Sequence, residues 1–116
     1  MAPSHNIINK KQTNWHWNFI NKQIKINPPY ANSMICAIRC SNSMLNSIKE
    51  YVIKYNNLFM DEALFNTLAI HNNLKVLSIG ELAGIVYRKD WKITEIVDTN
   101  LYHPIKNIDT QYSYRK

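Results

Sequence analysis

Glycine is scarce in this chain, with two residues among 116. Two isolated glycines cannot build the glycine-rich loop that cradles phosphates in many nucleotide-binding proteins. No apolar run approaches the roughly 20 residues that cross a bilayer. Lys10 and Lys11 interrupt the N-terminal region where a secretory signal would have its apolar core. We therefore expect a soluble chain without a membrane segment, and no sequence signal specifies its localisation.

Cysteine is equally scarce, and Cys36 and Cys40 are the only two. Residues 33–40 are mostly apolar and predict a buried strand, in which positions four apart lie about 13 Å from each other. A disulfide needs Cα atoms within about 7 Å. No further cluster of cysteine or histidine has the spacing of a zinc site. The sequence thus predicts two buried free thiols, no metal site and no other cofactor.

Acidic residues are absent from residues 1–49, which carry six lysine and arginine side chains. From Glu50 onward eight basic residues balance eight acidic ones, so the net charge of +6 comes from the first part of the chain. A basic segment with aromatic residues attracts phosphate, whether in a nucleic acid or in a nucleotide. A solvated lysine-rich surface would give the same pattern. The composition leaves both interpretations open.

The hydrophobic fraction of 46% in 116 residues indicates one globular domain with a modest core. Residues 1–14 are polar and predict a loose N-terminal arm. Residues 15–110 predict the folded subdomain, and residues 111–116 predict a polar tail.

Aromatic residues alternate at the start of this subdomain. Residues 15–26 therefore predict a strand with Trp15, Trp17 and Phe19 on one face. The two tryptophan rings could stack against the face of a sugar, or they could pack in the core.

Two helices are expected in the middle of the chain. Ser41-Asn42-Ser43 supplies N-cap candidates, and apolar residues then recur at helical spacing as far as Tyr55. A second helix is expected from about Asp61 to His71, with Leu64, Leu68 and His71 on its inner face. A short strand, a turn of helix and a further strand are expected at residues 74–77, 79–84 and 85–88.

Two adjacent carboxylates lie at the start of the second predicted helix. If Asp61 is the N-cap, its side chain accepts a hydrogen bond from the amide of Ala63 or Leu64. Glu62 then lies about 100° further around the helix and is available for another role. Both carboxylates would also complement the helix dipole, which needs no catalytic role.

Residues 61–68 read Asp-Glu-Ala-Leu-Phe-Asn-Thr-Leu. This octet resembles the catalytic-helix motif of the branching β-1,6-N-acetylglucosaminyltransferases and peptide O-xylosyltransferases, which are inverting enzymes with a GT-A type fold. The predicted strand at residues 33–40 and the helix ending in Tyr51-Val52 precede the octet in the order found in that family. The resemblance implies an α/β fold that is the C-terminal half of a GT-A domain, with two central helices packed on a few short strands.

The resemblance also implies roles for individual residues. Glu62 matches the general base, while Arg88 and Lys106 match basic residues that hold the donor diphosphate without a metal. The segment His103-Pro104 departs from the family pattern. A helix N-terminus lowers the pKa of a carboxylate, so burial would have to offset this effect for Glu62 to work as a base near neutral pH.

An Asp-x-Asp motif and a nucleotide-binding βαβ half are both missing from the sequence. The resemblance therefore implies a fragment with an incomplete donor site that is inactive alone. Its partners would be a nucleotide-sugar donor, a carbohydrate or glycoprotein acceptor, and a separate N-terminal half. The alternative is a small basic nucleic-acid-binding or accessory protein without catalysis, which the acid-free first part of the chain favours.

Overall fold

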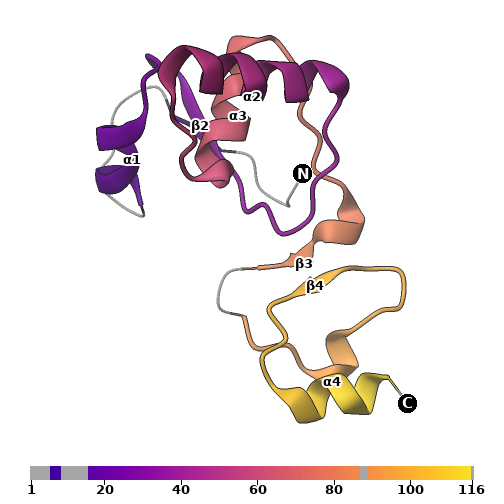
Figure 1. Cartoon of the computed structure of the whole chain (residues 1–116). Helices are drawn as coiled ribbons and strands as arrows, with labels where there is room; N and C mark the ends of the chain where they lie inside the picture. Colours follow the sequence, from indigo (N-terminus) through magenta and orange to yellow (C-terminus); the bar gives the residue numbers. More distant parts are fainter. Residues whose placement is uncertain (1–5, 9–15, 87–88, 116) are drawn as a thin grey trace.

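The computed structural model describes residues 6–8, 16–86 and 89–115, the first range by its backbone alone (Figure 1). These ranges form a mixed α/β arrangement, which confirms the fold class at this level. The helices are α1 (Trp17–Gln23), α2 (Asn42–Tyr55), α3 (Asp61–His71) and α4 (Ile108–Tyr114). The strands are β1 (Asn6–Ile8), β2 (Tyr30–Asn32), β3 (Gly84–Ile85) and β4 (Tyr102–His103). β1 pairs antiparallel with β2, and β3 pairs parallel with β4.

The elements gather in two parts (Figure 1). A helical part holds α1 to α3 with β1 and β2, and a C-terminal part holds β3, β4 and α4. The Cα radius of gyration is 16.3 Å, whereas a compact chain of this length would have about 13 Å. The loop that follows β2 reaches from the helical part toward β3 (Figure 1). The molecule is therefore elongated, with this loop at the junction of its two parts.

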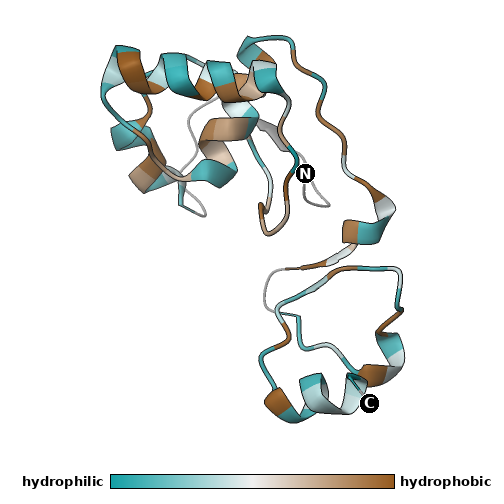
Figure 2. Cartoon of the chain, turned by 45° about the vertical axis from the view of Figure 1, so that its right-hand side comes forward, coloured by the Kyte–Doolittle hydropathy of each residue, from teal (hydrophilic) through white to brown (hydrophobic). Residues whose placement is uncertain are grey.

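Helix α2 begins and ends as the sequence predicts. Ser41 is the N-cap, and its Oγ accepts a hydrogen bond from the amide of Met44 at 3.2 Å. Asn56 ends the helix in the left-handed conformation, with φ of 45°, which asparagine tolerates better than most residues. Figure 2 shows hydrophobic and hydrophilic residues alternating along α2, as expected of a helix that buries one side. Leu45, which the apolar stripe was expected to include, is 52% exposed.

Helix α3 lies at the centre of the helical part, between α2 and β2. Leu64 and Leu68 are buried as predicted, whereas His71 is exposed and its Nε2 lies 3.1 Å from the carbonyl oxygen of Pro29. Complete burial of one such leucine contributes about 1.5–3 kcal/mol. The core cluster consists of buried residues from α1, β2, α2, α3 and the loop before α3: Trp17, Ile20, Tyr30, Met44, Tyr51, Phe59, Ala63, Leu64, Leu68 and Ala69.

The predicted strand at residues 15–26 is wrong over its described part, because Trp17–Gln23 is a helix. Trp17 and Ile20 are both buried, at a separation of three residues that a helix brings to one side. Phe19 is 54% exposed, so it does not share a face with Trp17. The helical spacing of the buried residues Trp17 and Ile20 therefore indicates the secondary structure here better than the alternation of aromatic residues does.

The predicted strand at residues 33–40 is also wrong, because the strand hydrogen bonding of β2 ends at Asn32. The amide of Ser33 instead donates to the carbonyl of Glu62 at 3.1 Å, which turns the loop toward α3. Both thiols are free as predicted. Cys36 is exposed and Cys40 is half-buried, so the predicted burial of both is wrong. Without a second strand to cover it, this segment lacks the burial that a strand in a sheet would have.

The short elements predicted after α3 are found in part. Residues 74–77 are irregular, although Leu74 and Val76 pack against the core cluster. A 3₁₀ turn at Gly80–Leu82 confirms the predicted turn of helix. Strand β3 is shorter than the predicted strand at residues 85–88, the last two residues of which lie outside the described ranges.

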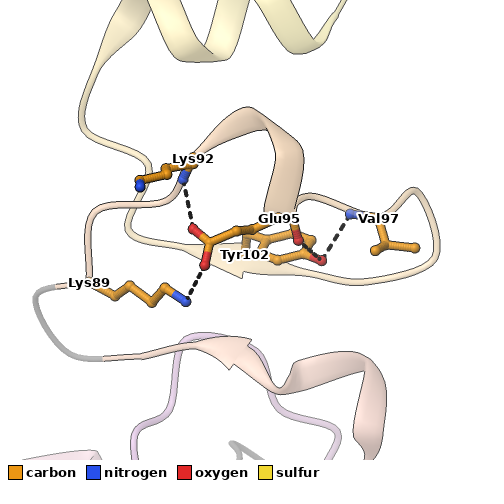
Figure 3. Close-up of polar contacts among 5 residues, drawn as sticks. All are labelled: Lys89, Lys92, Glu95, Val97 and Tyr102. Atoms are coloured by element: carbon orange, nitrogen blue, oxygen red, sulfur yellow. Dashed lines mark hydrogen bonds and ion pairs between the residues drawn. The ribbon is translucent and has the colours of Figure 1, made fainter.

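The C-terminal part is organised around Tyr102 (Figure 3). The hydroxyl of Tyr102 accepts from the amide of Val97 at 2.9 Å and donates to the carbonyl of Glu95 at 3.2 Å. The ring of Trp91 meets that of Tyr102 edge-on, with centroids 4.9 Å apart. Glu95 pairs with Lys89 at 3.0 Å and accepts from the amide of Lys92 at 3.0 Å. These contacts hold the segment between β3 and β4 in place.

No helix in the described ranges combines the length and the apolar character that a bilayer span requires.

Candidate functional site

The first turn of α3 carries both carboxylates of the octet. The N-cap is Met60, so the expectation that Asp61 is the N-cap is wrong. The amides of Ala63 and Leu64, which Asp61 was expected to bind, donate instead to the carbonyl of Met60 at 3.1 and 2.9 Å. Asp61 is the first helical residue, and its Oδ1 accepts from the amide of Glu62 at 2.9 Å. The Asp61 carboxylate therefore still stabilises the helix start, through a different amide.

Glu62 is half-buried at the place where the loop after β2 meets α3. Burial raises the pKa of Glu62 above its usual 4.5, while a hydrogen bond from the backbone of Ile35 acts in the opposite direction. The charge of Asp61 raises the pKa of Glu62 further, and His16 lowers it. The net direction is upward, as a general base working near neutral pH requires.

The backbone around Glu62 is tied to the loop by buried polar groups. Ser33 and Asn66 are 1% and 0% exposed. The Nδ2 of Asn66 donates to the Oγ of Ser33 at 2.9 Å and to the carbonyl of Glu62 at 2.7 Å. The sequence does not point to either residue. The resemblance of residues 61–68 to the catalytic-helix motif does not depend on Asn66, and Ser33 lies in the segment that the sequence predicts as a strand.

Cys36, in the loop that meets Glu62, lies close to His103 of the C-terminal part. Its Sγ lies 3.4 Å from the Nδ1 of His103 on β4, within hydrogen-bond distance for sulfur. Burial, followed by the charges of Glu62 and Asp61, raises the pKa of the Cys36 thiol above 9.0. The thiol is therefore largely protonated at neutral pH. The two residues are 67 positions apart, and no local pattern in the sequence links them.

Lys106 lies three residues after His103, at a cavity of about 430 Å³ in the C-terminal part. Lys89, Asp90, Pro104, Lys106 and Asn107 line this cavity. No pattern in the sequence marks Lys89 as a residue of this cavity. Lys89 forms an ion pair with Glu95, and its Nζ lies 3.9 Å from the centre of the Trp91 ring. Lys106 is exposed, with no ion-pair partner among the described residues. The cavity thus has two cationic side chains, one of them already paired.

Trp17 is the one described residue among the predicted site residues that remain. Trp17 is 2% exposed and stacks on Tyr30 with ring centroids 6.0 Å apart. A side chain this buried cannot offer a ring face to a sugar, so the prediction that Trp17 stacks on the acceptor is wrong. Trp15 and Arg88, the other predicted stacking residue and the predicted diphosphate ligand, lie outside the described residues.

Among the residues that the structure describes, no three histidine, cysteine, aspartate or glutamate side chains are arranged to hold a metal ion. Comparison with known protein families, curated proteins and solved structures finds no match for this chain. The function must therefore be argued from Glu62 and its surroundings.

Proposed function

We propose that this chain is glycosyltransferase-related, of the inverting and metal-independent type, with Glu62 as the general base. The observation that carries the proposal is the half-buried carboxylate of Glu62, whose pKa is raised by burial although it lies at a helix N-terminus. A surface carboxylate that only complements the helix dipole would have its pKa lowered. The resemblance of residues 61–68 to the catalytic-helix motif supplies the reaction class.

In this reaction an acceptor hydroxyl attacks the anomeric carbon of a nucleotide sugar. The Glu62 carboxylate takes the hydroxyl proton while the new carbon–oxygen bond forms. The bond from the anomeric carbon to the diphosphate breaks, and the electron pair leaves with the diphosphate. One displacement inverts the anomeric configuration, and it needs no oxidant or reductant.

The leaving diphosphate needs positive charge, which the cavity beside Lys106 can supply. Lys106 is the main candidate because it has no ion-pair partner within the described part of the chain. Lys89 is a second cation that lines the same cavity, and its ion pair with Glu95 reduces its effect. Arg88 precedes Lys89 in the sequence and retains its proposed role as a diphosphate ligand.

The finer fold assignment is part of this proposal. We infer a relation to the C-terminal half of a GT-A domain, with α2 and α3 as its two central helices. The described ranges contain two sheets of two strands each, which do not amount to a nucleotide-binding βαβ half. A separate chain that carries such a half would complete the donor site and restore turnover.

The test is a transfer and hydrolysis assay with nucleotide sugars, on the purified chain and on cell extract fractions that contain it. We expect Glu62→Gln to lower turnover by about 10²–10⁴-fold, the usual contribution of a general base. Asp61→Asn is the matched control, since it removes the neighbouring charge and leaves the base. Measurable turnover that is equal in wild type and Glu62→Gln would contradict the role of Glu62.

Binding of a nucleoside diphosphate tests the second half of the proposal without requiring turnover. We expect Lys106→Ala to weaken binding, and Lys75→Ala, which removes an exposed lysine of the helical part, to leave it unchanged. Salt-dependent binding of single-stranded RNA or DNA, with no binding of nucleoside diphosphate, would instead favour a nucleic-acid-binding module.

A further inference from the structure

We propose that Asn66 is a positioning residue that holds the backbone amide of Ile35 against the carboxylate of Glu62. The inference rests on the proposed role of Glu62 as the base, and it identifies what sets the protonation and orientation of that base. Asn66 lies one turn after Glu62 on α3 and is 0% exposed, so it does not touch a substrate. It acts through the loop that follows β2.

The contacts of Asn66 are specific to Glu62 and this loop. Both hydrogens of its Nδ2 are used, one on the Oγ of Ser33 at 2.9 Å and one on the carbonyl of Glu62 at 2.7 Å. The amide of Ser33 donates to the same carbonyl at 3.1 Å. Three hydrogen bonds thus join Ser33, Asn66 and the backbone of Glu62 in one buried bracket.

The bracket fixes the backbone at Ser33, two residues before Ile35. A hydrogen bond from the backbone of Ile35 acts to lower the pKa of Glu62, since it favours the charged form. The segment is not held by a strand partner, since β2 ends at Asn32. The side chains of Ser33 and Asn66 therefore replace the sheet in fixing this backbone.

The orientation of the Asn66 amide supports a role beyond packing. Its Oδ1 is buried and has no hydrogen-bond partner among the described residues. A flipped amide would bring that oxygen against the carbonyl of Glu62, so the observed orientation is the one that the surroundings permit. An unpaired buried carbonyl lowers stability, and such costs are characteristic of functional positions.

Thr67, the next residue on α3, provides a matched control. It is also 0% exposed, and its hydroxyl also bonds to the segment containing β2. Both hydrogen bonds of its hydroxyl join it to Ala31, which lies in β2 and not in the loop around Ile35. Thr67→Val therefore removes a buried tie from α3 to β2, whereas Asn66→Ala removes a buried tie from α3 to the loop that follows β2 and loosens the bracket.

The test is an NMR titration of the Glu62 carboxyl carbon in the unliganded chain, with hydrogen exchange of the Ile35 amide. We expect Asn66→Ala to raise the pKa of Glu62 further, because a hydrogen bond that lowers it is lost. Exchange at Ile35 should be about tenfold faster or more. Thr67→Val should reduce the stability of the fold and leave both readouts at their wild-type values.

A second variant keeps the proposal testable if Asn66→Ala does not fold. Ser33→Ala removes one acceptor of the bracket and should shift both readouts in the same direction, by less. Unchanged values for Glu62 and Ile35 in either folded variant would overturn the positioning role. Because both readouts need no substrate, measurable turnover that is equal in wild type and Glu62→Gln would contradict the proposed function while leaving this inference intact.

Discussion

The hydroxyl of Thr67 meets the backbone of Ala31 twice, accepting from its amide at 3.1 Å and donating to its carbonyl at 3.3 Å. Both residues are fully buried. Helix α3 thus occupies part of the place that a third strand beside β2 would take, and it satisfies backbone groups that a sheet would otherwise pair.

Replacement of this hydroxyl by a methyl group should destabilise the chain. Thr67→Val keeps the shape of the side chain and leaves polar groups of Ala31 unpaired, for an expected loss of about 1–3 kcal/mol in the free energy of unfolding. Urea unfolding measures the loss. Thr67→Ser, which keeps the hydroxyl, should lower the free energy of unfolding by less. Equal stability of Thr67→Val and wild type would show that water or another group forms hydrogen bonds to the amide and carbonyl of Ala31.

The stability of the chain should depend on pH through Glu62. Burial raises the pKa of Glu62 above 4.5, so folding favours the protonated form. Its contribution to stability is therefore fully present below pH 4.5 and is lost as the pH rises through the folded-state pKa. Glu62→Gln removes this dependence. The stability of the variant relative to wild type should increase between about pH 4 and pH 7, measured by urea unfolding; a constant difference would contradict the direction of the shift.

The thiol of Cys36 should react slowly with iodoacetamide at neutral pH. Only the thiolate reacts, and burial together with Glu62 and Asp61 raises the pKa of this thiol above 9.0. In a Cys40→Ser background, mass spectrometry should give an alkylation midpoint above that value. Glu62→Gln should move the midpoint down, whereas Glu50→Gln should not. A midpoint insensitive to Glu62 would mean that the two side chains lie further apart than described.

Gly84 should be the less replaceable of the two glycines. A Cβ at Gly84 would lie 2.5 Å from the Cδ1 of Tyr102 and 2.7 Å from the carbonyl oxygen of Leu101. Gly84→Ala should therefore cost about 1–3 kcal/mol in the C-terminal part. Gly80 has open space at the same position, so Gly80→Ala should be neutral or stabilising by up to about 1 kcal/mol.

Hydrogen exchange of the Val86 amide reports on the Gly84 prediction locally, because this amide donates to the carbonyl of His103 at 3.0 Å. Faster exchange in Gly84→Ala than in Gly80→Ala is the expected result. Equal rates would indicate that the ring of Tyr102 moves aside at little cost.

The two long helices could be predicted because their signals are local. Ser41 marks the start of α2, and buried Met44 and Tyr51 follow seven residues apart on one side. The pair Leu64 and Leu68 gives the buried side of α3 in the same way. These patterns depend on neighbouring turns of one helix, which the sequence shows directly.

The site could be predicted only in part, because its geometry depends on partners distant in sequence. Residues 33–40 resemble a strand in composition, but a strand forms only where another strand is available, and the loop bonds to α3 instead. The contact of Cys36 with His103 and the bracket formed by Asn66 both follow from the bonding of this loop to α3. Glu62 could be proposed from the sequence because the motif that contains it is contiguous.

The core cluster and the residues packed on it all lie between Trp17 and Val76 in the sequence. Every one of these side chains is joined to the growing chain before β3, and β3 can pair only after β4 has been added. The apolar contacts of the helical part need no residue of the C-terminal part. The half of the candidate site around Glu62 therefore depends on early residues for its core, whereas the cavity beside Lys106 depends on residues that are added later.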